Sequence, residues 1–74
     1  MDLMEARTKK RFTQWDLALL TGLSQSKISL IERGYIMPTD SEERIILTSL
    51  GVTKEEIQWH DRRTYPDGIA ISEV

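Results

Sequence analysis

Side chains able to recognise another molecule are concentrated in residues 14 to 29, where amides and hydroxyls alternate with apolar residues. Glutamine can form a bidentate pair with N6 and N7 of adenine, and serine can hydrogen-bond to either type of base edge. The chain has few side chains suited to covalent catalysis, because it has no cysteine and a single histidine, His60. No nucleophile and base pair is evident, and no set of ligands suits a tetrahedral metal site. The residue types therefore predict a binding protein without catalytic residues, cofactor or metal, rather than an enzyme.

Four side chains between residues 25 and 30 are candidates for contact with DNA bases. They are Gln25, Ser26, Ser29 and Leu30. Gln25 and Ser26 lie near the N-terminus of an expected helix, the part that enters a major groove most deeply. Solvated polar surface is the alternative for the polar residues. Leu30 either packs on Ile36 or Met37 or contacts a thymine methyl group, and the sequence leaves both open.

Basic side chains close to this stretch are candidates for contact with DNA phosphates. They are Lys9, Lys10, Arg11 and Lys27. Lys27 can equally reach a guanine edge, and the basic run at residues 9 to 11 can equally be solvated surface. Residues 1–34 carry six basic and four acidic side chains, whereas residues 35–74 carry four basic and eight acidic ones. Phosphates dock where positive charge is local, so the first half is the expected DNA side, while the net charge of −2 predicts modest non-specific affinity.

A helix, a tight turn and a second helix are expected to carry these groups, over residues 14 to 21 and 25 to 33. Gly22 stands where the chain must turn, because a residue past a helix end often takes a positive φ that glycine adopts without a Cβ penalty. Thr13 and Ser24 can cap the two helices by accepting backbone N–H groups. Apolar residues at helical spacing form the facing sides: Leu17, Ala18, Leu23, Ile28 and Ile31.

Three further helices complete an expected all-α fold of five helices in one compact domain. The first is predicted over residues 2 to 11 with Asp2 as its N-cap, and the last is a short helix that follows Thr53. The helix over residues 40 to 50 has two competing capping boxes, Thr39 with Glu42 and Asp40 with Glu43. The inward-facing residues of these three helices are expected to be Leu3, Ala6, Ile46, Leu47, Leu50 and Ile57.

Residues 14 to 33 resemble the helix-turn-helix of the phage-repressor (Xre/Cro) family of DNA-binding proteins. The similarity extends outward to Leu3, Ala6 and Arg7, Phe12 to Gln14, Ile28 to Gly34, Pro38 and Thr39, and Leu50 to Ile57. It covers residues 1 to 59 and implies a lambda-repressor-like DNA-binding domain there. Residues 60–74 depart from the family and form a tail or a short strand, with a turn signal at residues 65–68 and a candidate dimer contact.

The resemblance also implies roles for individual residues. A glutamine at position 14 donates to a backbone phosphate in this family and supports the recognition helix, here residues 25 to 33. Arg7 and Glu32 occupy positions that the family pairs as a partly buried structural ion pair. The implied function is a sequence-specific transcriptional regulator, a repressor of phage or prophage type that binds double-stranded DNA as a homodimer on a palindromic operator.

Trp15 and Leu19 depart from the family, which usually has polar residues at these positions of the first helix of the motif. Four residues apart, they share an exposed face that either the C-terminal tail or another subunit is expected to cover. This patch and the acidic second half favour an alternative, a protein-interaction module of antirepressor or antitoxin type that does not bind DNA. The sequence shows no membrane span and no signal peptide, which predicts a cytoplasmic protein, and it indicates no small-molecule substrate.

Overall fold

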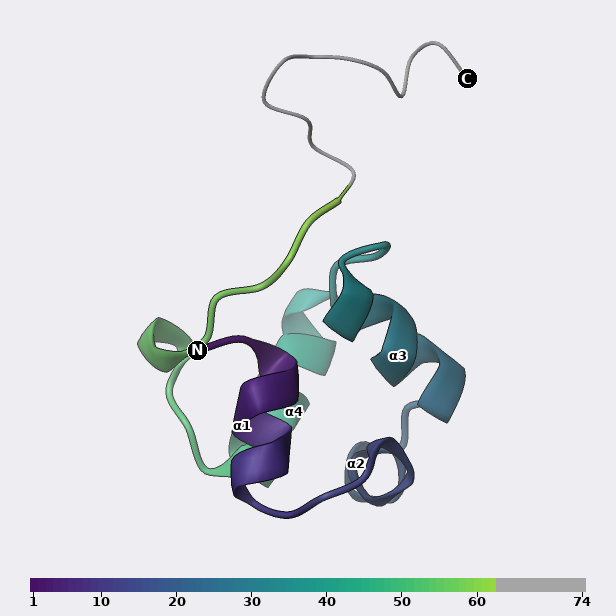
Figure 1. Cartoon of the computed structure of the whole chain (residues 1–74), viewed down its shortest axis with the longest axis vertical. Helices are drawn as coiled ribbons and strands as arrows, with labels where there is room; N and C mark the ends of the chain where they lie inside the picture. The colour runs from purple at the N-terminus through teal and green to yellow at the C-terminus, as the bar shows by residue number, and fades with distance from the viewer. Residues whose placement is uncertain (63–74) are drawn as a thin grey trace, which may run out of the picture.

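The computed structural model of the chain describes residues 1–62, which fold into four α-helices and one 3-10 turn. The helices are α1 (Leu3–Lys9), α2 (Gln14–Thr21), α3 (Gln25–Arg33) and α4 (Asp40–Leu50), and the turn is η1 (Lys54–Glu56). Figure 1 shows the helices gathered around a common centre, and α2 packs against both α3 and α4. The structure confirms the predicted all-α class.

Each α-helix begins after a residue whose side-chain oxygen accepts a backbone N–H, as predicted. The four N-caps are Asp2, Thr13, Ser24 and Thr39. The two capping boxes that compete in the sequence are now resolved, because Thr39 pairs with Glu42 and Asp40 becomes the first residue of α4. The Thr39 N–H donates to Glu42 Oε1 at 2.9 Å, which satisfies a backbone donor at the helix start.

Two predicted boundaries are wrong. Helix α1 ends at Lys9 rather than at Arg11, because Arg11 takes a positive φ of 61° and the Phe12 N–H turns back to the Arg7 carbonyl. This reversal aims the chain into α2. The predicted fifth helix is only the 3-10 turn η1, because Ile57 is already extended and the Gln58 N–H donates to the Met1 carbonyl.

The core consists of the residues that helical periodicity had placed inward. Its buried members are Leu3, Ala6, Leu17, Ile28, Ile31, Ile46, Leu50 and Ile57. Ala18, Leu23 and Leu47 are partly buried and pack against this cluster. Residues 63–74, which include the predicted turn at 65–68 and the segment at 69–74, lie outside the described residues.

Candidate nucleic-acid interface

The connection between α2 and α3 fixes the relative placement of the two helices. Gly22 has φ +79°, the left-handed conformation that glycine adopts most readily. Thr21 is buried, and its hydroxyl donates to the Leu17 carbonyl at 2.8 Å while accepting the Leu23 N–H at 3.2 Å. The Thr21 hydroxyl therefore closes the turn between the two helices. The outer face of α3 is held in one orientation as a result.

The outer face of α3 carries all four predicted base-contact residues, Gln25, Ser26, Ser29 and Leu30. Successive residues of a helix turn by about 100°, so Ser26, Ser29 and Leu30 point away from the buried Ile28 and Ile31, while Gln25 lies at the edge of this face, close to the buried Glu32 in angular position. Ser26 is exposed, and the other three are half-buried. Sequence reasoning overlooked Arg33 on this same face, although its position four residues after Ser29 and three after Leu30 could have revealed it.

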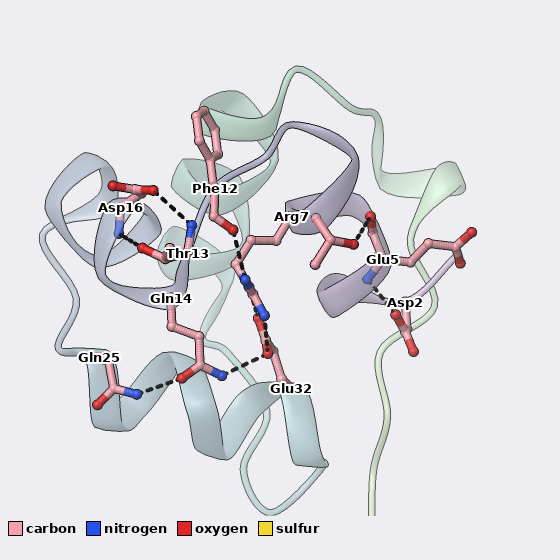
Figure 2. A network of polar contacts seen from close by, with 10 residues as sticks. Asp2, Glu5, Arg7, Phe12, Thr13, Gln14, Asp16, Gln25 and Glu32 are labelled. Carbon is pink, nitrogen blue, oxygen red and sulfur yellow. Dashed lines mark hydrogen bonds and ion pairs between the residues drawn. The ribbon is translucent and has the colours of Figure 1, made fainter.

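A chain of hydrogen bonds links the start of α3 to the start of α2 (Figure 2). The Gln25 amide donates to Gln14 Oε1 at 2.5 Å, and the Gln14 amide donates to Glu32 Oε1 at 2.9 Å. Gln14 thus holds the first and the penultimate residues of α3 together. Gln25 keeps its carbonyl oxygen and one amide hydrogen free of these contacts, and together these form the donor and acceptor pair that adenine requires.

The ion pair between Arg7 and Glu32 forms the other end of this network. Arg7 Nε lies 2.6 Å from Glu32 Oε2, and the terminal nitrogen Nη2 donates to Oε1 at 3.2 Å, a bidentate geometry. The remaining terminal nitrogen donates to the Phe12 carbonyl at 2.8 Å. The Glu32 side chain is only 2% exposed and that of Arg7 11%, so the charges are largely removed from water. One guanidinium therefore ties α1, the α1–α2 loop and α3 together.

Lys27 lies at the edge of the α3 face and turns toward α4. Its ammonium is 2.5 Å from Glu42 Oε2, with 37% of the lysine side chain exposed. The hydrogen bond from Lys27, followed by that from the Thr39 backbone, holds the pKa of Glu42 below its usual range. Part of the positive charge of Lys27 is therefore neutralised by the protein itself, although the side chain still borders the exposed face.

Acid should weaken the fold through Glu42 and through Asp2, whose pKa is lowered by the Glu5 N–H and next by His60. An unfolded carboxyl binds protons at a higher pH than a folded one with a lowered pKa. The stabilisation from these two carboxylates is therefore complete above their pKa in the unfolded chain, which is about 4. It is lost as the pH falls through their lower pKa values in the folded protein. Urea unfolding at several pH values between 7 and 3 should show this decline, with a shallower one in Glu42→Gln. An unfolding free energy that stays constant down to pH 3 would contradict it.

The basic run at residues 9–11 is exposed, and the contacts of the described residues do not bring it to α3. A Cβ added to Gly51 would lie 3.7 Å from Lys10 Nζ, so this ammonium sits beside the C-terminal end of α4. The negative end of the α4 dipole favours a cation at that place. A local structural role thus accompanies the proposed phosphate contact for Lys10.

Trp15 and Leu19 remain largely uncovered by the described part of the chain. They are 67% and 83% exposed, and Leu20 adds an apolar side chain that is 52% exposed. Trp59, in contrast, is half-buried against the core and its indole N–H donates to Glu43 Oε2 at 2.8 Å. Within residues 1–62, no helix has the length and apolarity that crossing a membrane requires.

The family model described as Helix-turn-helix matches residues 3–57, a range that runs from the start of α1 past η1. No significant match was found among curated proteins or among solved structures. The matched range covers most of the chain, and it agrees with the geometry of α2, the turn at Gly22 and α3. The resemblance drawn from the residues is thereby confirmed, and the chain belongs to the helix-turn-helix family of DNA-binding regulators.

Proposed function

We propose that this protein is a sequence-specific transcriptional repressor of phage or prophage type, which reads the major groove with α3. The observation that carries the proposal is the bond between Gln25 and Gln14, which joins the starts of the two helices of the motif. A base-reading side chain discriminates only if its orientation is set before it meets DNA. Here the orientation of Gln25 is set by Gln14, and that of Gln14 by the ion pair of Glu32 with Arg7.

Each candidate residue then has a distinct part in recognition. Gln25 pairs with a base edge, and Ser26 and Ser29 hydrogen-bond to neighbouring bases along the same face. Leu30, which is half-buried, contacts a thymine methyl group with its exposed part. Phosphate contacts come from the second amide hydrogen of Gln14 and from the free N–H groups at the start of α2.

The cationic residues Lys27, Lys9, Lys10 and Arg11 are proposed as further phosphate contacts. Lys27 can bridge Glu42 and a phosphate, because an ammonium has three donors. Such contacts position the protein on the duplex and carry no sequence information.

A homodimer on a palindromic operator is proposed because one α3 offers only a few base contacts. Two-fold pairing places a second reading helix about 34–36 Å away, one turn along the duplex. The region of η1 and the residues that follow it is the proposed interface, since it leaves the outer face of α3 free. Trp59 contributes less to such an interface than its residue type suggests, because it is already packed within its own subunit.

Selection of bound duplexes from a random pool, followed by mobility shift at two salt concentrations, tests this function. The expected result is a palindromic consensus sequence and binding that weakens strongly as salt rises, because bound phosphates release counterions. Failure to bind any duplex at low salt would overturn the DNA-binding proposal.

The exposed pair of Trp15 and Leu19 favours a second candidate, a protein-interaction module of the same fold. An apolar pair of this size on a small domain is typical of a surface that a partner covers. The acidic balance of residues 35–74 points the same way, since it opposes non-specific attraction to DNA. Absence of duplex binding combined with intact folding would favour this candidate over the repressor.

A further inference from the structure

Residues 58–62, which follow the family-matched range, fold back onto the domain and bring Arg62 beside the C-terminal end of α3. His60 Nε2 lies 3.0 Å from Asp2 Oδ2, and the Arg62 N–H donates to the Gly34 carbonyl at 2.7 Å. Gly34 is buried with φ +84°, and a Cβ there would approach His60 Cβ to 3.0 Å and the Arg62 backbone nitrogen to 3.1 Å. In Figure 1 the described chain accordingly runs up to the loop that follows α3. Residue 62 is thus held in place by the fold.

This docking brings two arginines to one aromatic ring. The guanidinium carbon of Arg33 lies 5.6 Å from the centroid of the Tyr35 ring, and that of Arg62 lies 5.5 Å from it. Within residues 1–62 neither guanidinium takes part in an ion pair with a carboxylate. Asp61 and Glu32 line the same pocket as the two arginines, and Glu32 is already engaged by Arg7 and Gln14. Arg33 and Arg62 are both exposed, so their guanidinium groups remain accessible to an anion from outside.

The position of this arginine pair relates it to the reading face of α3. Arg33 lies on the same side of the helix as Gln25 and Ser29, two turns and one turn further along. When the N-terminal part of a helix lies in the major groove, groups toward its other end lie near the backbone that borders the groove. Arginine also suits phosphate, because its planar guanidinium donates two parallel hydrogen bonds.

We propose that Arg33 and Arg62, positioned by Tyr35, form a phosphate-binding clamp that grips the DNA backbone at the C-terminal end of α3. This inference rests on the proposed DNA binding and extends it to a residue outside the family-matched range. The Tyr35 ring restricts both side chains through cation–π contacts, so less entropy is lost when a phosphate binds. Through Arg62, residues 58–62 then contribute to operator affinity.

The test measures duplex binding by the full chain over a series of salt concentrations for Arg33→Gln and Arg62→Gln. Each lost phosphate contact should reduce the slope of log K against log salt by about 0.9, with equal loss on specific and random duplexes. Arg44→Gln removes an exposed arginine of α4 and should leave the slope unchanged. Arg62→Lys keeps the charge and should retain the slope.

Slopes in Arg33→Gln and Arg62→Gln equal to that of Arg44→Gln would overturn the clamp, and the proposed DNA binding would stand. A wild type that binds no duplex would overturn both. Thermal unfolding of each variant, followed by circular dichroism, separates loss of the clamp from loss of the fold. A reduced slope with an unchanged melting temperature is the supporting result.

Discussion

Arg7→Ala is expected to lower the free energy of unfolding by up to about 3–5 kcal/mol, the loss that follows when one partner of a buried ion pair is removed. Among residues 1–62, the Glu32 carboxylate, 2% exposed, would keep only the amide of Gln14 as a hydrogen-bond partner. The Phe12 carbonyl would lose its donor as well. Because small domains have about 5–15 kcal/mol in total, urea unfolding should reveal a large shift of the midpoint.

Arg44→Ala is the matched control, since Arg44 is an exposed arginine on α4 that takes no part in the ion pairs formed within residues 1–62. It should change the unfolding free energy by less than about 0.5 kcal/mol. Arg7→Lys should fall between the two, because lysine keeps the charge and loses the bidentate geometry. Equal midpoints for Arg7→Ala and Arg44→Ala would show that the pair contributes nothing to stability.

Gln25→Ala is expected to weaken binding to the operator by about 1–3 kcal/mol and to relax the preference at one base position. The reason is that Gln25 would be the only side chain paired with that base, and alanine restores neither donor nor acceptor. Binding to a panel of operators with single base changes measures this directly. The wild type should discriminate at that position, and the variant should accept all four bases alike.

Lys27→Ala provides the contrast within the same helix. As a phosphate contact, Lys27 should matter equally for every operator of the panel, and its loss should lower the salt slope by about one. Lys27→Ala also removes the contact with Glu42 of α4. The unfolding free energies of Gln25→Ala and Lys27→Ala must therefore be measured together with their DNA binding. If the two variants weaken the panel in the same pattern, the division between base contact and phosphate contact is wrong.

Sequence alone predicted most of the fold, because helix formation in this chain is signalled locally. The caps Thr13 and Ser24, the glycine at position 22 and the spacing of Ile28 and Ile31 are all read within one or two turns. Local signals failed at the end of α1, where Arg11 adopts a left-handed conformation that favours glycine over arginine. They failed again at η1, where a long-range bond from Gln58 to Met1 pulls the chain out of a helix.

The candidate site was predictable in part. The helical wheel places Gln25, Ser26 and Ser29 on one outer face, and the family resemblance pairs Arg7 with Glu32. Neither source reveals that Gln14 bonds to both Gln25 and Glu32, since these contacts join residues that are distant in the sequence. The reach of Lys27 to Glu42 likewise depends on how α4 packs beside α3.

The sequence determined where helices start, which faces are apolar and which side chains are candidates for DNA contact, because these properties follow from residue type and spacing. The tertiary structure decided which of those side chains are free and which are already engaged. Lys27 and Trp59 are both held by partners that no local pattern indicates, and the Lys10 ammonium lies beside the C-terminal end of α4. The physical reason is that hydrogen bonds and ion pairs need a separation of about 3 Å between their atoms. Residues that are far apart in the sequence reach this separation only when the helices that carry them pack together.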